Sequence, residues 1–277
     1  MSGNFDNFVQ RMNSNIGYKS VILPLLPKGG VNILDVGGGA GVLSHQMKIS
    51  NPHAHITLLD HDVEMLKIAK ENKTADLYVS DMSELAYHTY DAIVLCSVLH
   101  EIPHWDSFFE KLLRYIKPGG KFIIRDGFKS ENTATMDILM EHNSFKPKKD
   151  YRIKLKNPLE AIAFFLKCGE KSFIGKLSLQ FTDDGYVMGM KDDVRTFLQT
   201  YTWGFESMHR EKNENHLFAT KDELYERITP YVCMNENTFK YTPICQQDYF
   251  KHLSKIAEID EMWNTHFVLE VTTHKEG

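Results

Sequence analysis

The feature that most constrains this chain is a glycine-rich turn that directly follows a short apolar stretch. The apolar residues lie between 31 and 34, Asp35 follows them, and glycines then occupy positions 37, 38, 39 and 41. A short apolar run is typical of a buried parallel strand. Glycines directly after it let the backbone turn sharply and approach a ligand closely, because they have no Cβ. The pattern predicts an α/β domain with a ligand site at the end of its first strand.

A second acidic residue, Asp60, ends the next strand-like run, residues 56–60. A carboxylate at this position accepts hydrogen bonds from ribose hydroxyls in nucleoside-binding folds. The dinucleotide fingerprint G-x-G-x-x-G, read from Gly37, would need a third glycine where this chain has Val42. A nicotinamide-dependent dehydrogenase stays open as an alternative, but the absent third glycine speaks against it.

The spacing Asp35-x-Gly37-x-Gly39-x-Gly41 resembles the first motif of the class I S-adenosylmethionine-dependent methyltransferases. The resemblance implies that this motif holds the amino-acid end of the cofactor, S-adenosylmethionine, and that the second acidic residue holds its ribose. A carboxylate suits the cationic amino group better than it suits a pyrophosphate. The cofactor-binding residues that the resemblance implies are Asp35, Gly37, Gly39, Gly41, Asp60, His61, Asp81, Met82, Cys96 and Ser97.

The rest of the chain follows the same family pattern in order. Apolar residues at helical spacing predict helices over 62–72 and 106–117, and apolar runs predict strands over 77–81 and 90–97. A Pro-Gly-Gly turn at 118–120 then opens a fifth strand. The resemblance covers residues 30–127. It implies an α/β fold with a doubly wound, seven-stranded, mostly parallel sheet whose last strand is antiparallel.

The chain end resembles the end of such a core, which sets the predicted domain boundaries. A capping-box pattern at 220–223 predicts a helix to about residue 230, followed by strands over 238–243 and 265–272. We therefore assign 30–127 and 218–277 to a Rossmann-like core, and 1–29 to N-terminal helices covering it. Residues 128–217 are too many for a structureless loop and are predicted to form a mostly helical cap that binds substrate.

Two segments of this insert carry functional hypotheses. A run that mixes aromatic and polar side chains predicts a substrate-facing loop, with a hinge of buried aromatics as the alternative, and its candidates are Trp203, Glu206, His209 and Arg210. The stretch 146–156 is rich in basic residues, which suits phosphate contacts. It keeps an RNA methyltransferase, acting on tRNA, as an alternative. Against that, the whole chain has 32 basic and 37 acidic residues.

The loop after the fourth predicted strand, residues 95–104, borders the methyl group in the resembling family. His100 is our candidate catalytic base, because an imidazole titrates near neutral pH and can take a proton from an acceptor. A purely structural His100 remains the alternative. Cys96 lies inside the strand without the Pro-Cys pair of ring-carbon methylases, which predicts a buried packing residue. A module that binds the cofactor without turnover also stays open.

Composition bounds the remaining properties. The four cysteines are scattered and form no C-x-x-C pair, which predicts reduced thiols and no metal site. No apolar stretch reaches the roughly 18 residues of a membrane helix, and no secretory signal is recognisable. We therefore expect a cytoplasmic enzyme with no membrane partner, which methylates the O or N of a small-molecule acceptor. The sequence does not indicate an oligomeric state.

Overall fold

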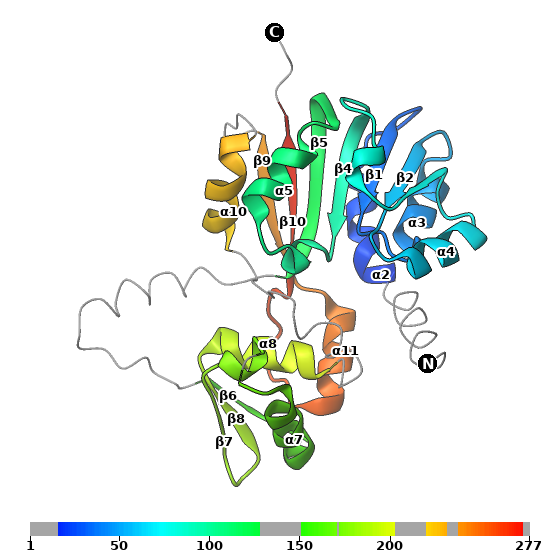
Figure 1. Ribbon diagram of the computed structural model, residues 1–277. Coiled ribbons are helices and arrows are strands. Elements are labelled where there is room, and N and C mark those ends of the chain that lie inside the picture. The colour runs from blue at the N-terminus through cyan, green and yellow to red at the C-terminus, as the bar shows by residue number, and fades with distance from the viewer. Residues whose placement is uncertain (1–15, 128–150, 171, 203–219, 232–237, 274–277) are drawn as a thin grey trace. The chain divides into compact units, whose positions relative to one another are not determined.

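The computed structural model describes residues 16–127, 151–170, 172–202, 220–231 and 238–273. These residues fall into two compact units (Figure 1). The core unit is drawn from 1–127, 221–244 and 266–277, and the inserted unit is drawn from 128–220 and 245–265.

The core unit contains a seven-stranded sheet, in which β10 is antiparallel to both of its neighbours, β5 and β9. The four strands on the other side of β5 run parallel to it. This topology confirms the predicted fold class. The strands in spatial order are β3 (Leu77–Val79), β2 (His55–Leu59), β1 (Asn32–Val36), β4 (Tyr90–Cys96), β5 (Ile116–Gly127), β10 (His266–Thr272) and β9 (Phe239–Ile244).

Short helices connect these strands. They are α2 (Ile16–Lys19), η1 (Ser20–Leu25), α3 (Val42–Ser50), α4 (Val63–Glu71), η2 (Met82–Glu84), η3 (Leu99–Glu101), α5 (Trp105–Leu112), α10 (Lys221–Ile228) and η6 (Thr229–Tyr231). Helix α5 ends before the predicted Lys117, because a turn from Leu112 O to Tyr115 N–H closes it and β5 begins at the next residue. The N-terminal helix predicted before residue 16 lies outside the described residues.

Both faces of the core sheet are covered by apolar side chains, in agreement with the nearly continuous burial along β1, β2 and β4. On one face, Ala92 and Val94 of β4 belong to a buried cluster with Met47 of α3 and Ile22 of η1. On the opposite face, the ring of Phe122 in β5 meets Phe109 of α5 edge to face, with centroids 6.3 Å apart. Figure 1 shows α5 and α10 beside β5, β10 and β9. At the ends of the strands, loops take the place of these apolar contacts. Polar residues can therefore lie there.

The inserted unit contains a three-stranded antiparallel sheet, in the order β6-β8-β7, as well as helices. Its elements are β6 (Tyr151–Lys154), α7 (Pro158–Cys168), η5 (Ile174–Lys176), β7 (Leu179–Phe181), β8 (Tyr186–Gly189), α8 (Lys191–Tyr201) and α11 (Gln247–Ile256). Apolar residues at helical spacing predict helices over 159–166 and 192–201, and α7 and α8 lie at these positions. The three-stranded sheet is an addition that the sequence analysis does not predict for this insert. The sequence also predicts a helix over 136–140, and these residues lie outside the described part of the chain.

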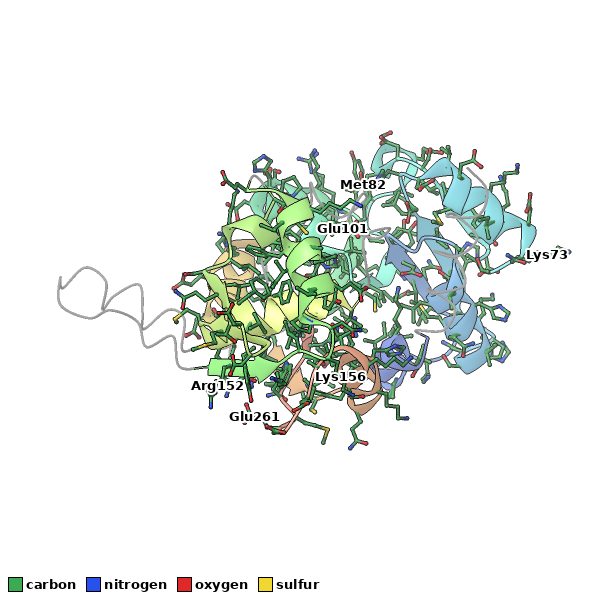
Figure 2. The ribbon with its side chains drawn as sticks, turned by 90° about the horizontal axis from the view of Figure 1, so that it is seen from below. Lys73, Met82, Glu101, Arg152, Lys156 and Glu261 are labelled. Carbon is green, nitrogen blue, oxygen red and sulfur yellow. The ribbon has the colours of Figure 1, made fainter. Side chains whose placement is uncertain are left out.

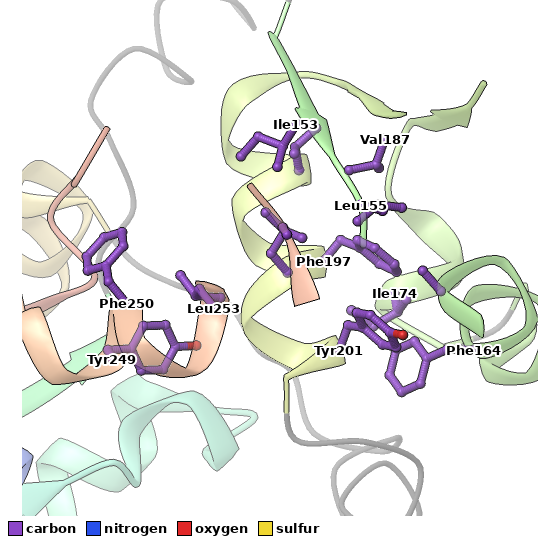
Figure 3. Close-up of a cluster of buried hydrophobic side chains, with 14 of the residues drawn as sticks. Ile153, Leu155, Phe164, Ile174, Val187, Phe197, Tyr201, Tyr249, Phe250 and Leu253 are labelled. Carbon is purple, nitrogen blue, oxygen red and sulfur yellow. The ribbon is translucent and has the colours of Figure 1, made fainter. Parts of the chain in front are cut away.

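One buried hydrophobic cluster joins the two chain segments of the inserted unit (Figure 3). Phe164 of α7 and Phe197 of α8 lie in the same cluster as Phe250 and Leu253 of α11. Residues 245–265, which the sequence analysis assigns to the core, therefore belong to the inserted unit. The reason is that the apolar face of α11 is buried in this cluster, while only the flanking strands β9 and β10 pair in the core sheet.

No helix among the described residues combines the length and the apolar character that crossing a membrane requires.

Candidate functional site

The turn after β1 has a backbone that only glycine accommodates easily. Gly37, Gly39 and Gly41 have φ values of 65°, 56° and 80°, in the left-handed region that disfavours residues with a Cβ. Space is restricted as well, because a Cβ on Gly37 would lie 2.5 Å from Cγ2 of Val98. A Cβ on Gly41 would collide with the side chain of Thr74. The turn is therefore a close-fitting backbone cradle, as the sequence predicts.

Asp60 ties this turn to the end of β2. Its Oδ2 accepts the backbone N–H of Gly39 at 2.7 Å, and its Oδ1 accepts the N–H of Asp62 at 2.9 Å. The N–H of Gly37 donates to the carbonyl of Leu59 at 2.7 Å. Because the side chain of Asp60 is only 10% exposed, its carboxylate is held in a fixed position against the turn. A ribose hydroxyl could donate to a carboxylate placed in this way.

Asp35, the last polar residue before the turn, is a buried carboxylate. Its Oδ2 accepts the hydroxyl of Ser44 at 2.6 Å. Burial raises the pKa of Asp35 to about 6, although the Ser44 hydrogen bond and the charge of Lys19 oppose the shift. A carboxylate whose negative charge is destabilised by burial gains strongly from a cation beside it. The residue therefore suits an ammonium group.

The other predicted cofactor residues on β2 and β3 lie at strand ends. Asp81 follows β3 and caps η2, since its Oδ1 accepts the N–H of Ser83 at 2.7 Å. Met82 is the first residue of η2. His61 follows Asp60, and its side chain is 92% exposed, with Nδ1 3.8 Å from Oδ1 of that carboxylate. Their roles toward an adenine or a ribose stay predictions.

At the end of β4, Cys96 is buried and Ser97 begins the loop. Burial raises the pKa of the Cys96 thiol, which keeps it protonated, and the side chain belongs to the apolar cluster on the α3 side of the sheet. Ser97 has a left-handed φ of 60°. Its N–H donates to the carbonyl of Arg125 at 2.8 Å, and its hydroxyl accepts from Nη1 of Arg125 at 2.6 Å. The loop is thereby anchored to β5.

His100 is held by Asp126, a residue of β5 that the sequence analysis does not single out. Nδ1 of His100 lies 2.7 Å from Oδ1 of Asp126, and the backbone N–H of His100 donates to Oδ2 at 3.2 Å. Nε2 of His100 lies 3.9 Å from Oε1 of Glu101. Burial alone would raise the pKa of Asp126, but the charge and hydrogen bond of His100 lower it to about 2. A sequence signal existed, because two charged residues, 125 and 126, end an apolar strand.

The structure brings several of the predicted residues together. Val98 contacts the glycine turn at Gly37, and His100 follows two residues later in the same loop. Asp35, the turn and Asp60 form one continuous polar arrangement at the carboxyl ends of β1 and β2. This is the edge where open α/β sheets bind ligands. The substrate candidates Trp203, Glu206, His209 and Arg210 lie outside the described residues.

The basic stretch 146–156 is partly committed to contacts within the inserted unit. Arg152 and Lys154 lie over the ring of Tyr186, at 5.0 Å and 4.7 Å from its centroid. Nζ of Lys156 donates to the carbonyl of Ser254 at 2.6 Å. Figure 2 labels Arg152 and Lys156 on this unit. Residues 146–150 lie outside the described residues.

The described residues contain no cluster of His, Cys, Asp and Glu side chains suited to a metal ion.

Comparison with known proteins agrees with this arrangement. A family model described as a methyltransferase domain matches residues 27–197, well over half of the chain. A ubiquinone/menaquinone biosynthesis C-methyltransferase from Brucella canis is 26% identical over 123 residues, which are 41% of this chain and 45% of that protein. Its namesake from Bartonella tribocorum is 29% identical over 101 residues, 33% of this chain and 39% of that protein. The chain thus matches less than half the length of these relatives.

A solved structure matches almost the whole chain. The S-adenosylmethionine dependent methyltransferase from Mesorhizobium loti has a TM-score of 0.53 at 14% identity, covering 91% of this chain and 95% of that chain. At this identity the match speaks for the fold. Together with the family match it confirms the resemblance that the sequence analysis draws from the glycine turn.

Proposed function

This chain belongs to the methyltransferase domain family, and from that premise we propose that it methylates an oxygen or nitrogen of a small-molecule acceptor. The observation that carries the proposal is the glycine turn held between the carboxylates of Asp35 and Asp60. The cofactor of the family, S-adenosylmethionine, supplies a methyl group on a positively charged sulfur, which is already activated for transfer.

The described residues fit this cofactor by their chemistry. Asp35 is a buried carboxylate that a cationic amino group would stabilise, and Asp60 offers acceptor oxygens for ribose hydroxyls. A Cβ at Gly37 or Gly41 would collide with Val98 or Thr74, so the close-fitting shape of the turn requires glycine there. We expect Asp81 and Met82 to lie beside the adenine. Methyl transfer then depends mainly on aligning the acceptor, and orientation can supply roughly 7–11 kcal/mol of the acceleration.

A small molecule is the acceptor that the observations favour over RNA. The curated relatives are named for the biosynthesis of ubiquinone and menaquinone, and both of these compounds are small molecules. The chain carries a formal net charge of −5, whereas binding of long nucleic acids generally relies on a basic surface. Three basic residues of 146–156 already contact groups inside the inserted unit. We expect residues 128–217 to select the acceptor.

Methylation at carbon is a second candidate, because the curated relatives are C-methyltransferases. Incubation with S-adenosylmethionine carrying a ¹³C-methyl group and a panel of phenols, alcohols, amines and quinols distinguishes the products. The ¹³C NMR chemical shift of the transferred methyl group distinguishes O-methyl, N-methyl and C-methyl products. Cofactor binding without any labelled product across the panel and a tRNA pool would favour a non-catalytic module. Preferential binding of NADH would contradict the proposal.

A further inference from the structure

Asp126 and His100 form a pair that the family assignment does not explain. We infer that Asp126 is a positioning residue that makes Nε2 of His100 the proton acceptor, so that the methylated group is one that carries a removable proton. This inference rests on the proposed function and deepens it, because it assigns a chemical class to the acceptor.

The geometry around Nδ1 decides the tautomer. An ionised carboxylate only accepts hydrogen bonds, so the 2.7 Å contact with Oδ1 of Asp126 requires a proton on Nδ1 of His100. In a neutral imidazole the lone pair then belongs to Nε2. The second oxygen of Asp126 accepts the backbone N–H of His100 at 3.2 Å. One carboxylate therefore fixes the ring and the backbone of the same residue.

The charges around the ring favour taking up a proton. Asp126 faces it from β5, and Glu101 of η3 lies 3.9 Å from Nε2. Two further residues that can carry a positive charge interact electrostatically with this pair. Arg125 acts on Asp126, and His266 interacts with both Asp126 and His100. Arg125 donates to Ser97, and the pKa of His266 is well below its usual value, because burial and Arg125 both disfavour its charge. An imidazolium at His100 would thus lie between carboxylates, with a neutral His266 nearby.

The loop that carries His100 is anchored on two sides. Nε1–H of Trp105 donates to the carbonyl of Leu99 at 3.0 Å, which closes the loop on α5. Val98 lies against Gly37 of the turn. The side chain of His100 is 16% exposed. A partly exposed base on a fixed loop beside the glycine turn is placed to meet an acceptor there, rather than to serve only as packing.

The proposed step conserves atoms and charge. An acceptor O–H or N–H gives its proton to Nε2 of His100 while its lone pair bonds to the methyl carbon. The bond between that carbon and the sulfur breaks, and its electron pair stays on the sulfur. The products are the methylated acceptor, the neutral thioether and an imidazolium paired with Asp126. A hydroxyl, a phenol or a neutral amine fits this step.

The test reads the histidine itself and needs no acceptor. Long-range ¹H–¹⁵N spectra of protein labelled at histidine, assigned with His100→Gln, report tautomer and pKa for each ring. We expect His100 to carry its proton on Nδ1 when neutral, and Asp126→Asn to lower its pKa by at least about one unit. His88, whose Nδ1 faces the carbonyl of Ile116 near the other end of β4, should not change. Asp91→Asn, which removes the partner of Lys117, is the matched carboxylate control.

Three results would overturn the inference. They are a wild-type His100 protonated on Nε2 when neutral, a His100 still cationic above pH 9, or an Asp126→Asn variant with an unchanged pKa. The wild-type spectrum decides the tautomer even if the variant fails to fold. Calorimetry gives a separate readout, the affinity for S-adenosylmethionine. We expect this affinity to change less than threefold in Asp126→Asn. Absence of binding to the wild-type protein would refute the proposed function, whatever the tautomer.

Discussion

The backbone N–H of Gly39 donates to Oδ2 of Asp60 across 2.7 Å, which joins the turn after β1 to the end of β2. The two residues lie 21 positions apart in the sequence. Because the same carboxylate also accepts the N–H of Asp62, it holds two loops at once. The shape of the turn and the acceptor oxygens that we propose for a ribose therefore depend on one side chain.

Replacing Asp60 by Asn should weaken S-adenosylmethionine binding by about 1–3 kcal/mol, because a buried hydrogen-bonding group loses its charge and one acceptor oxygen. Isothermal titration calorimetry measures the change. The matched control is Asp62→Asn, which changes the cap of α4 and keeps a side chain that caps well. Equal affinity in the wild type and Asp60→Asn would remove Asp60 from the site.

Replacing Gly41 by Ala should destabilise the protein more than replacing Gly29, although both have a left-handed φ, 80° and 89°. The backbone penalty of about 1–2 kcal/mol is shared. A Cβ at Gly29 meets nothing within 4 Å, whereas one at Gly41 collides with Thr74, and overpacking adds about 1–3 kcal/mol. Thermal unfolding followed by circular dichroism compares the two. Similar melting temperatures would show that the turn is not closely packed.

Affinity for S-adenosylmethionine should fall as the pH falls below about 6. Burial raises the pKa of Asp35 to about 6, so the carboxylate is neutralised there and loses its attraction for a cation. The expected slope approaches tenfold per pH unit. Calorimetry between pH 5 and 8 measures it, and Asp35→Asn should bind weakly with a flattened profile. A wild-type affinity that does not vary across this range would contradict the assignment.

The raised pKa of Asp35 also makes the stability of the protein depend on pH, in a predictable direction. Between about pH 4 and 6 the folded protein holds a proton on Asp35 that the unfolded chain has released, so the free energy of unfolding falls as the pH rises through this window. Asp35→Asn should remove that slope. Asp76 is the control with the opposite sign, because hydrogen bonds from Lys48 and Ile56 lower its pKa against the effect of burial. Chemical denaturation at several pH values separates the two.

Replacing Arg195 by Met should lower the stability of the inserted unit by about 1–2 kcal/mol. Its guanidinium lies 4.6 Å from the ring centroid of Trp263, and its side chain is only 12% exposed, so the cation–π contact is largely shielded from water. Lys191→Met is the matched control, because Lys191 pairs with the same Glu261 as Arg195 does but is 49% exposed. We expect the control to cost less than about 1 kcal/mol. Unfolding followed by calorimetry compares the two variants. Equal losses of unfolding free energy in both would refute the predicted difference.

Most of the core could be predicted because its signals are local. An apolar run such as that of β1 predicts a buried strand by itself, and Asp62 predicts the start of α4 from its neighbours. The small sheet of the inserted unit was missed although β6 alternates apolar Tyr151 and Ile153 with basic residues. Four residues are the shortest run in which alternation indicates a strand, so the basic composition dominates the pattern of this segment.

The residues that remained hidden act over long sequence distances. Asp126 meets His100 only because β4 and β5 are neighbours in the sheet, and nothing within either segment states that contact. Likewise, α11 follows a core strand, yet its apolar residues Phe250 and Leu253 lie in one buried cluster with residues from 153–201, far earlier in the chain. Spacing within a motif predicts a turn or a cap, whereas pairings of this kind follow from the tertiary arrangement.

The chain departs from its core after Gly127 and again after Ile244, and returns at Lys221 and His266. A chimaera that exchanged only 128–220 for the corresponding region of a relative would keep α11 and Trp263 while removing the surface that shelters them. The apolar side chains left uncovered would promote aggregation. Exchanging the inserted unit on this scaffold therefore requires both excursions to be transplanted together.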